Sequence, residues 1–182
     1  MIRFPPIADD VMTPAQRAVA AEIASGPRGS VRGPFLALLH NPELAQRVQA
    51  LGEYLRFRTG FARPLTEIAV LVTARKWTCQ YEWLAHEALA RKAGVNPAII
   101  EAISERRSPP AMSADEEIVY TFCAQVNERG EPDDATFAAA VEKFGRPGAL
   151  NLIALCGYYS LLAMVLNTAK LPLPDDAPPP LR

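Results

Sequence analysis

Several segments of the chain begin with the same local signal for the start of a helix, a capping residue followed by proline. Thr13-Pro14 sets the pattern near the start, and Asn41-Pro42 and Asn96-Pro97 repeat it. A polar side chain before the first turn accepts a hydrogen bond from a free backbone N–H, and proline fits the first turn because its missing N–H would have no partner there. No segment alternates apolar and polar residues with the period of a half-buried strand. The sequence therefore predicts an all-α fold.

Seven or eight helices are expected from these starts and from the glycines that end them. In the segment 41–60, Leu44, Val48, Leu51 and Leu55 recur every three or four residues, so we expect one buried stripe. The expected helical segments are 12–25, 41–60, 64–94 with a break near Lys76–Thr78, 96–104, 113–130, 132–145 and 146–170.

One domain is expected over residues 1–170, followed by a proline-rich tail over residues 171–182. Five of the twelve tail residues are prolines, which favours an extended or disordered segment. The segment 150–166 is strongly apolar, but Asn151 and two tyrosines interrupt it, so we expect a buried helix rather than a membrane span. This helix is apolar almost all round, which points to a homo-oligomer.

Charge and composition exclude several classes of partner. A net charge of −1 and a pI near 6.1 give no general attraction to nucleic acid or to an anionic membrane. The start, MIRFPPIADD, lacks the apolar run of a signal peptide. Three widely spaced cysteines do not make a disulfide framework. We therefore expect a cytoplasmic protein whose partner is a small molecule.

The segment 79–86, CQYEWLAH, concentrates groups that can titrate. On a helix Cys79, Glu82 and His86 have the spacing i, i+3, i+7 and lie within about 80° of one another. Trp83 adjoins the same stripe. Glu67 lies in the first turn of another apolar helix, where the helix dipole favours an acid. If that helix is buried, Glu67 needs a partner and is a second carboxylate for His86.

Each of these residues also has an explanation without chemistry. Glu82 and His86 can be an exposed i,i+4 pair worth about 0.2–0.5 kcal/mol, and Cys79 can be a small buried hydrophobe. Cys123 and Cys156 lie on apolar helical faces and are interpreted as packing residues.

Two further kinds of site are not favoured. Glu67, Glu82 and His86 could supply three metal ligands, but no second histidine lies near them, so no metal is expected. The loop 26–35, GPRGSVRGPF, follows no strand and lacks the Gly-Lys-Ser/Thr ending of a phosphate loop. Arg28 and Arg32 are either steering charges for an anion or solvated loop charges, and the second is the default.

Residues 64–103 resemble the core of the carboxymuconolactone decarboxylase family, which includes alkylhydroperoxidase D. The shared pattern is a glutamate in an apolar helix, the Cys-x-x-Cys-x-x-x-His region, then ARKAG and a short helix. The resemblance implies an alkylhydroperoxidase D-like all-α bundle of two related halves, assembled as trimers or hexamers. In peroxidase members two cysteines form a redox dithiol, with glutamate and histidine passing protons. Glu67, Cys79 and His86 match these positions, while Glu82 replaces the second cysteine.

The decarboxylase members resemble the chain at the altered position, because their motif is similar to Glu82-x-x-x-His86. The resemblance implies loss of carbon dioxide from a small carboxylated lactone without a cofactor. Our preferred hypothesis is an acid–base enzyme in which His86 transfers protons, Glu82 and Glu67 orient it, and Trp83 forms an apolar wall. The alternatives are a thiol-dependent peroxidase that uses Cys79 with an external resolving thiol, and a non-catalytic ligand-binding protein.

Overall fold

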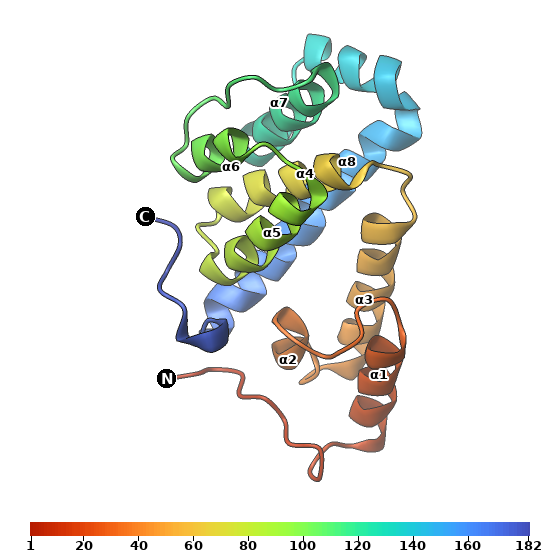
Figure 1. Cartoon of the computed structure of the whole chain (residues 1–182). Coiled ribbons are helices and arrows are strands. Elements are labelled where there is room, and N and C mark those ends of the chain that lie inside the picture. The colour runs from red at the N-terminus through yellow and green to blue at the C-terminus, as the bar shows by residue number, and fades with distance from the viewer.

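The computed structural model describes all 182 residues, which form eight α-helices and one 3-10 helix (Figure 1). The all-α prediction is confirmed, and the expected break after Lys76 separates two of the helices. The elements are α1 (Pro14–Ser25), α2 (Pro34–Leu38), α3 (Pro42–Phe57), α4 (Arg63–Lys76), α5 (Gln80–Ala93), α6 (Pro97–Ser104), α7 (Ala114–Arg129), α8 (Asp134–Ala169) and η1 (Pro174–Asp176).

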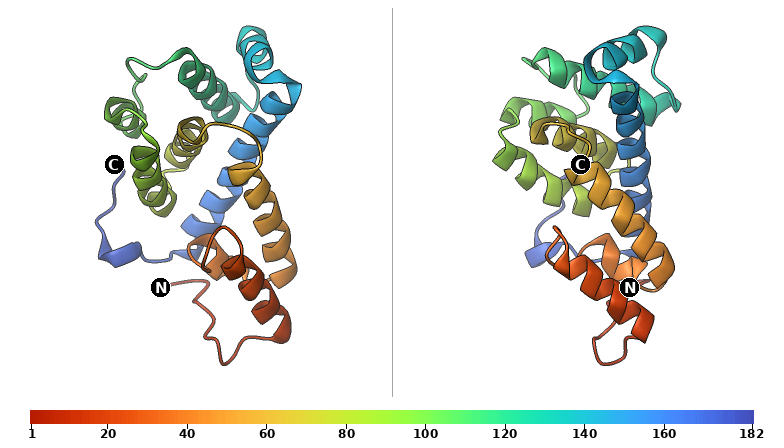
Figure 2. Two further views of the ribbon diagram at one scale, coloured as in Figure 1. Left: turned by 45° about the vertical axis from the view of Figure 1, so that its right-hand side comes forward. Right: turned by 90° about the vertical axis from the view of Figure 1, so that its right-hand side faces the viewer.

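Helix α4 lies at the centre of the bundle. Every residue from Leu65 to Arg75 is buried, because α5, α7 and α8 pack around it (Figures 1 and 2). A charged side chain on such a helix has no contact with water, so the charge of Glu67 must be compensated by groups from neighbouring helices. The position of Glu67 is therefore the first structural sign of a site.

Helix α8 contains both of the segments, 132–145 and 146–170, that were expected to be separate helices. The backbone changes direction where they meet, since Gly145 has φ 70° and ψ 170°, outside the helical range. Glycine tolerates a positive φ, and Pro147 lacks an N–H for the helix ladder, so the kink falls where both are available. Helix α8 is the one helix that is long and apolar enough to cross a membrane, by length and composition only. Half of its most apolar 18-residue window is buried inside the protein.

The expected stripe on α3 is only partly buried. Val48 and Leu55 lie in the core, but Leu44 is 42% and Leu51 is 47% exposed. The buried residues of α3 centre on a direction between Val48 and Ala45. At about 100° of rotation per residue, this direction lies roughly 65° around the helix from the centre of the leucine stripe. The prediction of one buried stripe is therefore wrong for Leu44 and Leu51, which lie at its outer edge.

The proline-rich tail packs against the rest of the chain and is extended on both sides of η1. The side-chain amide of Gln80 donates to the Leu181 carbonyl at 2.9 Å and accepts from the Leu181 N–H at 2.8 Å. Arg75 donates to the main-chain oxygen of Arg182 at 2.7 Å, and Leu181 is buried. The tail is thus held against the α4–α5 junction, and Pro174 in η1 reaches the cavity described below.

Gly52 on α3 makes room for Arg28, which lines this cavity, and for Tyr158, which accepts a hydrogen bond from Arg28. A Cβ there would lie 2.0 Å from the Tyr158 hydroxyl and 2.4 Å from Arg28 Nη2. We expect Gly52→Ala to lower the free energy of unfolding by about 1–3 kcal/mol, because the added methyl overpacks the site. Gly157→Ala is the control: beyond its chain neighbours and the nearby backbone of α8, nothing lies within 4 Å of the added Cβ, so helix propensity should raise stability by about 0.5–1 kcal/mol. Urea unfolding measures both, and a stabilising Gly52→Ala would contradict this packing.

Candidate active site

The imidazole of His86 lies between two carboxylates. Its Nδ1 is 2.6 Å from Glu67 Oε2, and its Nε2 is 3.3 Å from Glu82 Oε1. All three side chains are buried, Glu67 completely. The interpretation of Glu82 and His86 as an exposed helix pair is therefore wrong, and Glu67 does reach His86.

The local geometry follows from two helices. Glu82 and His86 are one turn apart on α5, which places them on the same face. Packing of α5 on α4 brings Glu67 to the opposite ring nitrogen. Arg63, one turn before Glu67 on α4, holds its Nη2 3.7 Å from Glu67 Oε1. The arrangement thus alternates cation, carboxylate, imidazole and carboxylate.

This arrangement sets the protonation of His86. Burial alone would lower the pKa of His86, but hydrogen bonds and charges from Glu67 and Glu82 outweigh it and raise the pKa above its usual value. In the protonated ring both nitrogens donate, one to each carboxylate. The two carboxylates therefore favour the protonated ring and hold it in a fixed orientation.

Glu82 leaves one oxygen free at this site. Its Oε2 is buried and has no hydrogen-bond partner in the chain, as is also true of Glu67 Oε1. Buried carboxylate oxygens are normally satisfied, so such an atom calls for an explanation. Because Glu82 lines a cavity, its free oxygen is placed to accept a hydrogen bond from a bound molecule.

A cavity of about 490 Å³ opens beside His86 and Glu82. Its size suits a small organic molecule. Four cationic side chains line it, from the loop before α2, from α3 and from α5: Arg28, Arg32, Arg56 and Lys92. The excess of cations over carboxylates in the lining makes the cavity suited to an anion.

Arg28 is fixed rather than a solvated loop charge. Its Nε donates to Gln49 Oε1 at 2.8 Å and its Nη2 donates to the Tyr158 hydroxyl at 3.0 Å. Its guanidinium also lies 4.6 Å from the centroid of the Phe35 ring. The default interpretation of the loop charges is therefore wrong for Arg28, whereas Arg32 is exposed as expected.

Tyr159 on α8 completes the site and was not predicted from the sequence. Its ring meets the His86 ring edge-on, with centroids 5.1 Å apart and an interplanar angle of 83°. Burial raises the pKa of Tyr159, so the phenol keeps its proton and can donate it in a hydrogen bond. Tyr159 lies in the most apolar run of the chain, where nothing in the sequence distinguishes it from a packing residue.

The structure does not bring Cys79 or Trp83 to the cavity. Cys79 precedes α5 as its N-cap residue, with φ −83° and ψ 98°, and packs with Ala163 and Leu166 of α8. Trp83 is fully buried in the core, about 100° around α5 from Glu82, and its indole N–H donates to Glu87 Oε2 at 2.9 Å. The expected single face of Cys79, Glu82 and His86 therefore reduces to Glu82 and His86.

Cys79 is expected to be a poor nucleophile. Burial raises the pKa of its thiol to about 12, against smaller opposing effects of backbone hydrogen bonds. Alkylation of the folded protein by iodoacetamide at Cys79 should remain slow at neutral pH and become rapid only in denaturant. The same reaction on the unfolded chain is the control. Fast modification of native Cys79 near pH 7 would contradict this environment.

The site is not arranged for a metal ion. No group of three His, Cys, Asp or Glu side chains is placed to hold one. Both ring nitrogens of His86 are already engaged by carboxylates, so the ring offers no lone pair to a metal.

No family model matches the sequence, and no curated protein matches it. The structure is similar to the crystal structure of an alkylhydroperoxidase AhpD core, an uncharacterized peroxidase-related protein from Ralstonia eutropha. The two are 21% identical with a TM-score of 0.78, covering 96% of this chain and 93% of the other. This likeness establishes the class of fold. The chain has the alkylhydroperoxidase D-like helical fold, as the sequence predicted.

Proposed function

We propose that the protein is a cofactor-free acid–base enzyme of the carboxymuconolactone decarboxylase type. Its substrate is a small carboxylated or enolisable cyclic molecule, such as a lactone acid. The observation that carries the proposal is the buried Glu67–His86–Glu82 arrangement beside a cavity rich in cations.

The proton chemistry is assigned to His86. Loss of carbon dioxide, or removal of a proton next to a carbonyl, leaves an electron pair that is delocalised as an enolate. His86 supplies the proton for that carbon from Nε2 through Glu82, whose second oxygen, Oε2, has no partner in the chain and is placed to meet the substrate. Glu67 holds Nδ1 and keeps the ring in one orientation, as a positioning residue. Tyr159 can donate a hydrogen bond to the developing oxyanion.

The cationic side chains that line the cavity are assigned to substrate binding. Arg28 is held rigidly and Arg56 carries a buried Nε with no partner, so both can donate to a carboxylate without first breaking another ion pair. Attraction of an anion into a partly enclosed cavity is strong at low ionic strength and weakens with salt. A carboxylated substrate therefore suits this cavity better than a neutral one.

The test uses a panel of lactone acids and β-keto acids with the purified protein. Release of carbon dioxide and exchange of carbon-bound hydrogen with deuterated water are both measured, for the wild type and for Glu82→Gln. Turnover by the wild type that falls in Glu82→Gln supports the proposal. Binding of panel members without release or exchange would overturn it and favour the ligand-binding alternative.

The second candidate is a thiol peroxidase, which the similarity to a peroxidase-related protein favours. In this chain that activity would use Cys79 and an external resolving thiol. Two features weigh against it: the raised pKa of Cys79 and its position outside the cavity. A Cys79→Ser variant that keeps full turnover on the panel is expected under our proposal.

We also propose a cytoplasmic homo-oligomer, a trimer or a hexamer. An exposed apolar stripe runs along the outer face of α8 through Leu150, Ile153 and Met164, and Leu51 on α3 is exposed as well. A second copy of the chain would remove this stripe from water. Sedimentation should give a mass above that of one chain, and Leu150→Arg should shift it towards the monomer. A wild type that is monomeric at all concentrations would contradict this assembly.

A further inference from the structure

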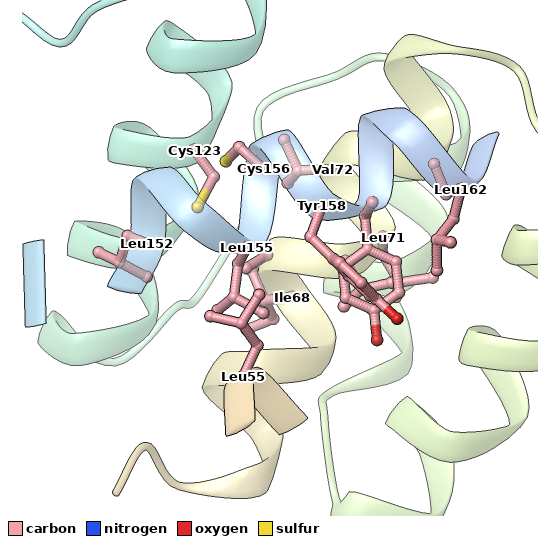
Figure 3. Close-up of a cluster of buried hydrophobic side chains, with 14 of the residues drawn as sticks. Leu55, Ile68, Leu71, Val72, Cys123, Leu152, Leu155, Cys156, Tyr158 and Leu162 are labelled. Atoms are coloured by element: carbon pink, nitrogen blue, oxygen red, sulfur yellow. The ribbon is translucent and has the colours of Figure 1, made fainter. Parts of the chain in front are cut away.

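Two cysteines that play no part in the acid–base site face each other across the α7–α8 packing. Cys123 of α7 and Cys156 of α8 lie side by side in the buried core (Figure 3). Both are free thiols and both are buried. The third cysteine, Cys79, belongs to a separate cluster and has no thiol neighbour. The pair is therefore distinct in its surroundings from an isolated packing cysteine.

The surroundings of the pair are polar for a protein core. Asn127 on α7 donates to Thr73 Oγ1 at 3.0 Å and to the Cys123 carbonyl at 2.8 Å. Hydrogen bonding to Cys156 and burial both raise the pKa of Cys123. Hydrogen bonding from Cys123 lowers the pKa of Cys156, with help from Thr73 and Asn127 and against the effect of burial. The two pKa shifts run in opposite directions, and Thr73 and Asn127 act on Cys156, which favours Cys156 as the thiolate and Cys123 as the thiol that keeps the proton.

A second cavity lies one residue away from this pair. It has a volume of about 330 Å³, and Asn127, which donates to the Cys123 carbonyl, is one of its lining residues. The rim of this cavity carries Arg75, Lys76 and Arg106. Asn127 therefore contacts both the cavity and the surroundings of the pair. A hydroperoxide is small and polar, so the cavity is the site from which we expect it to approach the thiols.

We propose that Cys123 and Cys156 are a redox dithiol that a hydroperoxide oxidises to a disulfide joining α7 to α8. In the first step the Cys156 thiolate attacks a peroxide oxygen: the S–O bond forms, the O–O bond breaks, and the other oxygen leaves as water or an alcohol after taking a proton. In the second step Cys123 sulfur attacks the Cys156 sulfenic acid: the S–S bond forms, the S–O bond breaks, and water leaves with the Cys123 proton. Two thiols are oxidised and one peroxide is reduced.

The disulfide would also act close to the proposed active site. Cys156 precedes Tyr159 by one turn of α8, and Tyr159 packs on His86.

Linking α7 to α8 closes a loop from residue 123 to residue 156, which restricts the unfolded chain. Oxidation should therefore raise the thermal midpoint Tm by several degrees, and reduction should restore it.

The experiment treats the reduced full-length protein with hydrogen peroxide under native conditions and then alkylates it in denaturant. We expect the alkylatable thiols to fall from three to one, with the intact mass lower by two hydrogens and a Cys123–Cys156 link in the peptide map. Dithiothreitol should reverse both changes. Cys79→Ser is the matched control and should form the same link.

Two further measurements make the result decisive. In Cys123→Ser the reaction should stop at a sulfenic acid on Cys156, trapped with dimedone. In the wild type the oxidation rate should be insensitive to low, non-denaturing urea, because the folded protein reacts. The proposal is overturned if three thiols survive peroxide, if the link involves Cys79 or a second chain, or if the rate rises with urea in step with global unfolding.

Discussion

His86→Gln is expected to lower kcat on a turned-over lactone acid by about 10²–10⁴-fold, the usual contribution of a positioned general acid–base group. Glutamine is polar and similar in reach, but it cannot supply a proton to Glu82 for transfer to the substrate. The Michaelis constant should change much less, because the cations that hold the carboxylate remain in place. Steady-state kinetics and hydrogen–deuterium exchange at the reacting carbon both report the loss.

His40→Gln is the matched control, since His40 is the other histidine of the chain. It is exposed, its Nε2 lies 2.9 Å from the Pro5 carbonyl, and it does not line the cavity beside His86. Turnover by His40→Gln should equal that of the wild type. Unchanged kcat in a folded His86→Gln protein would remove His86 from the proton-transfer step.

Glu67→Gln is expected to lower the free energy of unfolding by about 3 kcal/mol near pH 6, because it breaks a buried, short ion pair and leaves the imidazolium with one carboxylate. The effect should depend on pH. The folded pKa of His86 is raised, so the stability from its protonation is fully present below about 6.5, the pKa of an unfolded histidine, and is lost as pH rises through the folded pKa.

Urea unfolding at about pH 6 and about pH 9 measures this dependence. The difference between the wild type and Glu67→Gln should be largest at the lower pH and should narrow at the higher one. Glu43→Gln is the control, because Glu43 forms an exposed i,i+4 pair with Arg47 at 2.8 Å, worth about 0.3–0.5 kcal/mol. A pH-independent loss in Glu67→Gln would mean that Glu67 does not hold the His86 proton.

The fold could be predicted from local signals because several helix starts carry their own. Thr13, Asn41 and Asn96 all accept the capping hydrogen bonds that their sequence positions suggested. The path of the chain between helices is harder to predict. Thr78 adopts φ 45° at the α4–α5 junction, which ends helical spacing just before Cys79. Cys79 was therefore placed on a helix face that begins only after it.

The candidate site could be predicted only as far as helical spacing reaches. Spacing pairs Glu82 with His86, but it cannot say whether that face is covered. Burial comes from α4 and α8, which lie elsewhere in the sequence, and so does the second carboxylate, Glu67. Tyr159 reaches the cavity through tertiary packing alone, and no local pattern marks it. The glycine-rich loop marks Arg28 as a candidate anion contact, but its fixed position depends on Gln49 and Tyr158, which lie far away in the sequence.

One of the two tryptophans is buried and the other is exposed, so their fluorescence can be separated with a quencher. Trp83 is buried beside the Glu82–His86 turn, whereas Trp77 is 39% exposed and donates to Ser160 Oγ at 2.8 Å. Acrylamide should quench the emission of Trp77 and spare that of Trp83. The fluorescence that survives the quencher then comes from α5, the helix that carries Glu82 and His86, so a compound whose binding alters this helix should change that emission.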